Sequence, residues 1–110
     1  MSRYQLGEFE EIVMLTVGIL HKEAYGVSII DEIEARLERK VSIGALQTVL
    51  RRLENKGYLT SEFGEATNVR GGKRKRYFSL TMLGSRILRE TKSQRLDLFK
   101  AIPRVAFPKS

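Results

Sequence analysis

The sequence predicts a mainly α-helical fold with one small two-stranded antiparallel hairpin. Four separate stretches repeat apolar residues at three- and four-residue steps, which is the period of an amphipathic helix. Between the third and the fourth stretch, two short segments alternate apolar and polar residues, as half-buried strands do. The expected order is therefore helix, helix, helix, strand, strand, helix.

The composition limits the class of protein. The chain has 110 residues, enough for a single hydrophobic core, and 42% of them are apolar, which excludes a disordered tail. It contains no cysteine, which excludes disulfides and thiolate metal sites. No membrane-spanning run and no signal peptide is recognisable, and no motif requires a cofactor or a metal. We therefore expect a cytoplasmic protein without a membrane partner.

The first helix is expected from about Leu6 to His21. It has one apolar face and a second, smaller one formed by Ile12, Leu15 and Ile19, so it should be buried on several sides. Three glutamates near its start suit the positive end of the helix dipole, and no further ligands complete a metal site around them. The larger face consists of Leu6, Phe9, Val13, Thr16, Val17 and Leu20.

The second helix is expected over residues 26–37. Val27, Ile30, Ile33 and Leu37 should be buried, because they recur with the helical period. The opposite side carries charged residues that we assign to a solvated surface.

The third helix is expected between Ser42, a good N-cap, and Gly57, which suits the left-handed residue that closes a helix. One face is apolar, and the other begins with small residues and continues with arginines. Such a polar face fits either a solvated surface or a helix that enters a groove. The apolar face holds Ile43, Leu46, Val49, Leu50 and Leu53. The polar face holds Gly44, Thr48, Arg51 and Asn55, with Gln47 and Arg52 on its flanks.

The two strands are expected at Leu59–Phe63 and Lys75–Leu80, because both segments alternate with period two. The glycines between them predict a hairpin with a long tip. Five cations and no acid lie between Arg70 and Arg76. This density favours contact with phosphate groups over a merely solvated loop.

The last helix is expected to start at Met82, after Thr81 as its N-cap, and to end at Pro103. Leu83, Ile87 and Leu88 give it an apolar side, which Leu96, Phe99 and Ile102 resume. The polar stretch from Arg89 to Arg95 predicts that the helix is exposed or bent there. The tail after Pro103 has no periodicity and is left unassigned.

The charge is unevenly distributed. The whole chain carries a formal net charge of +7, to which residues 1–40 contribute five basic and eight acidic side chains and residues 41–110 fifteen basic and five acidic ones. The positive half contains the third helix and the hairpin, which indicates a polyanionic partner. Together these elements predict a winged helix-turn-helix, in which the third helix enters the major groove of double-stranded DNA and the wing contacts its backbone.

Four segments resemble the PadR family of prokaryotic transcriptional regulators, over about Leu6 to Arg89. They are LGEFEEIVMLTVGIL, AYGVSIIDEIE, VSIGALQTVLRRLENKGYLTSEFGE and RGGKRKRYFSLTMLG. The resemblance implies a homodimeric repressor of an inverted-repeat operator. It also implies a winged-helix domain over residues 1–81 and a C-terminal dimerisation helix with its tail over residues 82–110. Many members release DNA when a small-molecule effector binds near the dimer interface.

Three sets of site residues follow. The predicted recognition residues of the third helix are Ser42, Gly44, Ala45, Gln47, Thr48, Arg51 and Arg52. The predicted wing contacts are Arg70, Lys73, Arg74, Lys75 and Arg76. The predicted dimer interface, by resemblance, consists of Leu6, Phe9, Val13, Leu83, Ile87, Leu96, Phe99 and Ile102.

One residue departs from the family pattern: Gln47 stands where the family usually has tyrosine. Glutamine can make a bidentate contact to adenine, so we expect an altered operator preference. The alternative function is a nonspecific nucleic-acid-binding protein, either nucleoid-like or RNA-binding. A dimer that binds no DNA is disfavoured by the basic wing. An enzyme is disfavoured because the single histidine, His21, more plausibly ends a helix. Tyr25, Phe99 and Ile102 suit either an effector pocket or structural packing, and packing is favoured.

Overall fold

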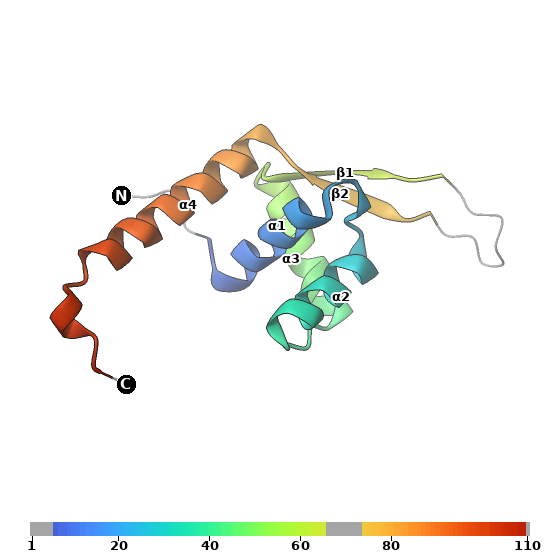
Figure 1. The fold of residues 1–110 in the computed structure, drawn as a ribbon. Helices are drawn as coiled ribbons and strands as arrows, with labels where there is room; N and C mark the ends of the chain where they lie inside the picture. The colour runs from blue at the N-terminus through green and yellow to red at the C-terminus, as the bar shows by residue number, and fades with distance from the viewer. Residues whose placement is uncertain (1–5, 66–73, 110) are drawn as a thin grey trace.

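The computed structural model describes residues 6–65 and 74–109, which form four α-helices and one two-stranded sheet (Figure 1). The predicted order of helices and strands is confirmed, as is the mainly helical fold class. A short 3-10 turn follows α1 and another follows α4. In chain order the elements are α1 (Glu8–Leu20), η1 (His21–Glu23), α2 (Gly26–Leu37), α3 (Ile43–Asn55), β1 (Leu59–Phe63), β2 (Arg76–Leu80), α4 (Met82–Ala101) and η2 (Arg104–Ala106).

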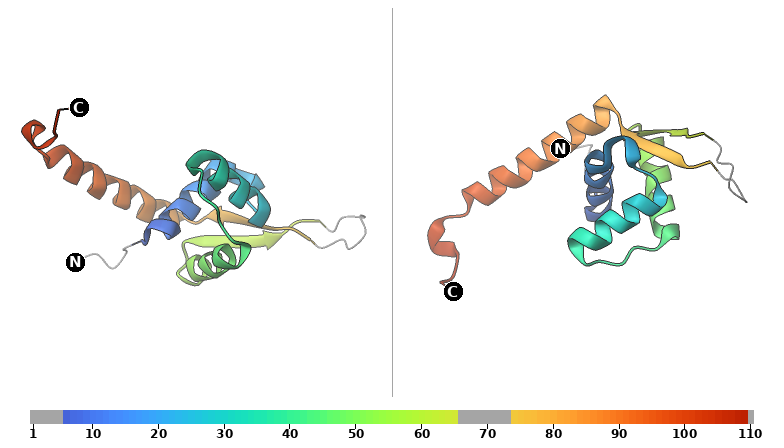
Figure 2. Two further views of the ribbon diagram at one scale, coloured as in Figure 1. Left: turned by 90° about the horizontal axis from the view of Figure 1, so that it is seen from below. Right: turned by 45° about the vertical axis from the view of Figure 1, so that its right-hand side comes forward.

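One hydrophobic core lies between α1, α2 and α3, and the hairpin and the first turns of α4 close it (Figures 1 and 2). The predicted apolar stripe of α3 is buried except for Ile43, which lies in the first turn and is 48% exposed. The largest fully buried side chains come from α1, α2, α3, β1 and α4. They are Met14, Ile29, Ile33, Leu46, Leu53, Leu59 and Ile87, with Val13 and Val17.

The hairpin, which we call the wing, comprises β1, β2 and the residues between them. Leu59 pairs with Leu80 and Phe63 with Arg76 in an antiparallel register. The N–H of Phe78 donates to the carbonyl oxygen of Ala24 at 2.8 Å, which joins β2 to the turn before α2. The base of the wing is thereby fixed to the helical body.

Local signals in the sequence end and begin the elements as predicted. The Ser42 hydroxyl accepts from the N–H of Ala45 at 3.1 Å and caps α3. Gly57 has the left-handed conformation, with φ 81°, just beyond the end of that helix. The Thr81 hydroxyl accepts from the N–H of Gly84 at 2.9 Å and caps α4.

Helix α4 begins on the core and then leaves it. Gly84 and Ile87 are buried, whereas nearly all side chains after Leu88 are exposed. The helix is continuous through the polar stretch 89–95, so that stretch is exposed within one helix. Figure 2 shows α4 projecting from one side of the helical body and the wing from the other, and the molecule measures 61 × 33 × 21 Å.

The burial predicted for α1 and for the end of β1 is wrong in part. Leu15 and Ile19 are 47% and 50% exposed, because the other elements of the chain pack against one side of α1 only. Phe63 is 57% exposed, since it lies at the end of β1 beyond the helical core. An apolar strip of α1 therefore remains open in the single chain.

The face predicted for α2 is also partly wrong. Ile29 and Ile33 are fully buried, whereas Val27 and Leu37 are 57% and 49% exposed. The two neighbouring isoleucines at positions 29 and 30 gave the helix two overlapping apolar faces. Packing against α1 and α3 selected the face that contains Ile29.

Candidate nucleic-acid interface

All seven predicted recognition residues lie exposed on α3 or at its N-cap. Gly44, Thr48 and Arg51 lie opposite the buried stripe. Gln47 lies on the flank toward the wing, and Arg52 lies on the other flank, toward α1. The N-terminal half of this surface is made of small or short side chains. A Cβ atom added at Gly44 would meet no atom of residues 6–65 or 74–109 within 4 Å, so this point of the helix is open.

A groove of about 970 Å³ runs between α3 and the base of the wing. Gln47 and Arg51 line it from α3. Arg74, Lys75 and Arg76 line it from the wing. The fold therefore brings together, in one groove, residues that the sequence predicted separately as base-reading and phosphate-binding.

The described wing cations differ in their surroundings. The Lys75 Nζ atom lies 4.3 Å from the ring centroid of Tyr25, which also meets Tyr77 edge to face at 5.6 Å. Arg76 turns toward Glu54 of α3, with 3.1 Å between Nη2 and Oε1. Tyr25 thus packs against the wing in this chain. The predicted contacts Arg70 and Lys73 lie outside the described residues.

Arg52 lies on the flank of α3 that faces α1, beside a buried carboxylate. Glu10 of α1 is only 7% exposed, and its carboxylate accepts from the N–H of Gly7 at 2.8 Å and from Lys56 Nζ at 3.0 Å. Arg52 Nη1 lies 3.9 Å from the same carboxylate. Burial acts to raise the pKa of Glu10, but the Gly7 N–H, Lys56 and Arg52 outweigh it and hold that pKa below its ordinary value of 4.5.

We expect the stability of the fold to depend on this carboxylate. Its pKa is lower in the folded than in the unfolded chain, so its contribution is present above pH 4.5 and is lost as the pH falls through the folded pKa. Glu10→Gln should lower the free energy of unfolding by about 1–2 kcal/mol at neutral pH and weaken the loss of stability in acid. Urea unfolding at a series of pH values measures both effects.

Glu8→Gln is the matched control for that experiment. Glu8 belongs to the same first turn of α1, but its side chain is 76% exposed, and within the described part of the chain it pairs with Arg39 only. Its substitution should leave the stability profile nearly unchanged. If both variants behaved alike, the connection between Glu10 and α3 would contribute nothing measurable.

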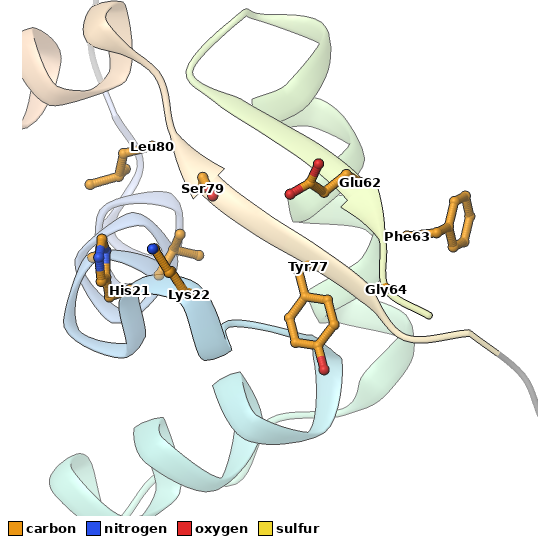
Figure 3. Close-up of a pocket in the computed structure, with 10 residues that line it drawn as sticks. His21, Lys22, Glu62, Phe63, Gly64, Tyr77, Ser79 and Leu80 are labelled. Atoms are coloured by element: carbon orange, nitrogen blue, oxygen red, sulfur yellow. The ribbon is translucent and has the colours of Figure 1, made fainter. Parts of the chain in front are cut away.

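A second hollow, of about 580 Å³, lies between the end of α1 and the outer face of the wing (Figure 3). His21 and Lys22 line it from η1, and Tyr77, Ser79 and Leu80 line it from β2. In Figure 3 the Phe63 side chain points away from the other labelled residues. No hydrogen bond joins the His21 side chain to the described residues around it.

Comparison with known proteins decides the family. The model of the transcriptional regulator PadR-like family matches residues 15–90 of the chain. The chain belongs to the PadR family. The resemblance inferred from the sequence is thereby confirmed. No curated protein matches the chain.

Solved structures of PadR-family proteins have the same fold. A PadR-like transcription factor from Bacteroides fragilis is 36% identical, with a TM-score of 0.69 and 84% of each chain covered. A PadR family regulator from Clostridium difficile is 30% identical, with a TM-score of 0.64, over 84% of this chain and 91% of that one. One from Eggerthella lenta is 28% identical, with a TM-score of 0.68, over 93% and 88%.

PadR membership establishes the general function. The chain is a transcriptional regulator and not an enzyme, and PadR regulators bind DNA. The exposed face of α3 and the groove beside the wing are the candidate surfaces for that partner. Within residues 6–65 and 74–109, no helix is long and apolar enough to cross a membrane.

Proposed function

We propose that this PadR-family regulator is a homodimeric repressor that binds an inverted-repeat operator with α3 and the wing of each protomer. The observation that carries the proposal is the shared groove, where the polar face of α3 meets the wing cations. A protruding helix of this size fits the major groove of B-DNA, and cations beside it fit the flanking phosphates. Such a repressor would act in the cytoplasm.

Each residue of α3 has a role in this proposal. Gln47 and Thr48 read base edges, and Gly44 and Ala45 permit close approach to the duplex. The Thr48 hydroxyl donates to the carbonyl of Gly44 at 3.0 Å, which fixes its rotamer and leaves its lone pairs for a donor on a base. Ser42, Arg51 and Arg52 extend the contact to flanking phosphates or bases; they and the other named residues of α3 are exposed.

The proposed dimer uses the apolar surface that the single chain leaves open. Leu96 and Phe99 of α4 are 42% and 61% exposed, and Ile102, the C-cap of that helix, is 41% exposed. On α1, Leu15 and Ile19 are exposed to a similar degree. Packing α4 of one protomer on α1 of its partner would cover both surfaces. A small-molecule effector at this interface would act by changing the spacing of the two recognition helices.

The other predicted interface residues lie deeper. Val13 and Ile87 are fully buried within the single chain, and Leu6 is 9% exposed. Phe9 and Leu83 are partly buried against the same core. In the proposed dimer these five residues pack under the side chains that form the interface. Val13 and Ile87 have almost no exposed surface with which to contact a second chain.

The test is binding and footprinting on the promoter fragment upstream of the chain's own gene, at two salt concentrations. Two protected half-sites about one helical turn, ~10 base pairs, apart would support a dimeric, specific regulator. If four to eight phosphates are neutralised, the log–log salt slope should be roughly −4 to −7. A slope near zero would contradict the proposal.

Random duplex and single-stranded DNA are the controls, because they separate the proposal from a nonspecific binder. Uniform coating without a footprint would favour the nonspecific alternative. Single-strand binders generally need exposed aromatic rings for base stacking. Tyr58 and Phe78 are buried, and Tyr77 is half-buried against Tyr25. Phe63 is 57% exposed, but its ring already lies beside the guanidinium of Arg76, which supports the duplex operator instead.

A further inference from the structure

Arg76 forms hydrogen bonds with other side chains of the chain, whereas Arg74 and Lys75 form none among the residues that the structure describes. Its Nε donates to Ser61 Oγ at 2.8 Å, and its Nη2 donates to Glu54 Oε1 at 3.1 Å. Ser61 Oγ in turn donates to Glu54 Oε2 at 2.6 Å. Three side chains, from α3, β1 and β2, therefore form one closed ring of hydrogen bonds.

Two aromatic rings hold the guanidinium of Arg76 in this arrangement. Its Cζ lies 5.4 Å from the ring centroid of Phe63 and 5.8 Å from that of Phe78. A planar guanidinium suits such a site, because it can lie against a ring and still donate in two directions at its edge. Phe63, which lies beyond the helical core, thus has a contact partner in Arg76.

The charges in the ring have a direct consequence for DNA binding. Glu54 is the single acidic residue of α3. Its carboxylate accepts a charge-assisted hydrogen bond from Arg76 and offsets the positive charge of that side chain. Lys75 lies over the uncharged ring of Tyr25 and keeps its positive charge. Arg74, next to it, is exposed. These neighbouring cations of the wing therefore have different surroundings and different roles.

We infer that Arg76 is a positioning residue for operator binding: with Glu54 and Ser61 it fixes the angle between the wing and α3. Arg74 and Lys75 contact phosphates, and Arg76 holds them in register with the bases that α3 reads. This inference rests on the proposed operator binding. It replaces the interpretation of Arg76 as one more phosphate contact.

The double variant Glu54→Gln/Arg76→Gln tests the inference, because it removes both charges and leaves the net charge unchanged. Operator affinity should fall by roughly tenfold, and discrimination against random duplex should fall with it. The salt slope should stay at the wild-type value, since no phosphate contact is lost. Lys75→Gln is the matched control, and its slope should shrink by about 1.8 for a dimer that loses two contacts.

Two results would overturn the inference. A slope that shrinks in the double variant as much as in Lys75→Gln would show that Arg76 binds phosphate. Unchanged affinity together with an unchanged slope would show that the wing needs no such fixing. Wild-type protein that fails to bind the operator would refute the proposed function itself, and the inference with it.

Thermal unfolding of the double variant shows whether it folds. If it does not fold, Ser61→Ala is the second test. It removes only the bridging hydroxyl and keeps both charges. A loss of affinity of a fewfold at constant slope and constant unfolding temperature supports the inference. Wild-type affinity in Ser61→Ala contradicts it.

Discussion

Gly84→Ala is expected to destabilise the fold by on the order of 3 kcal/mol. A Cβ atom at this position would lie 2.1 Å from the carbonyl oxygen of Tyr58 and 2.9 Å from its carbonyl carbon. Both are backbone atoms, so no side chain can rotate out of the way. The same carbonyl accepts from the N–H of Thr81 at 3.1 Å, and the N–H of Tyr58 donates to Leu53 at 3.0 Å, which fixes this backbone in place.

Urea unfolding followed by circular dichroism measures this effect, with Gly44→Ala as the control. Gly44 is also a helical glycine, but a Cβ there has open space around it. Alanine at this position should stabilise the helix by up to about 1 kcal/mol. It should weaken operator binding if the duplex approaches there closely. Equal unfolding midpoints for Gly84→Ala and the wild type would mean that α4 packs less closely against the backbone of Tyr58, just before β1.

Phe99→Glu is expected to convert the proposed dimer into monomers and to lower operator affinity on the order of a hundredfold. Phe99 is 61% exposed on α4 and contacts Phe107 of the tail, with ring centroids 5.8 Å apart. A carboxylate there would have to be desolvated at the interface, which is costly without a partner cation. Two linked α3 helices bind an inverted repeat far more tightly than one, so the loss extends to DNA.

Sedimentation equilibrium and operator titration of the same sample measure the two effects. Gln94→Glu introduces the same charge on α4, five residues earlier and so roughly 140° around the helix from Phe99. It should leave the assembly and the affinity unchanged. A dimeric Phe99→Glu protein would move the interface away from the outer half of α4.

Local signals were enough to predict most of the fold. The N-caps Ser42 and Thr81 and the left-handed Gly57 act within a few residues of themselves, so the sequence contains all the information that they need. The bounds of β1 also agree with the prediction, because the alternation of apolar and polar residues that marks the strand lies within the strand itself. The α2 face was misassigned because Ile29 and Ile30 satisfy two helical faces equally, and only packing against α1 and α3 distinguishes them.

The sequence predicted which residues belong to the candidate site, but not which of them contact one another. The exposed face of α3 followed from its period, and the charge density of the wing was visible in the sequence. That Arg76 pairs with Glu54, 22 residues earlier, could not be read from a run of cations. Nor could the burial of Glu10, whose partner Lys56 is 46 residues away, because both pairs exist only once the helices pack.

The outward course of α4 has a consequence for the length of the operator. In the proposed dimer this helix is the rigid arm that sets how far apart, and at what rotation, the two α3 helices are held. One residue inserted after Leu88 would turn everything beyond it by about 100° and advance it by about 1.5 Å. Two paralogues with identical recognition residues would therefore bind operators with different half-site spacing if their α4 helices differed in length.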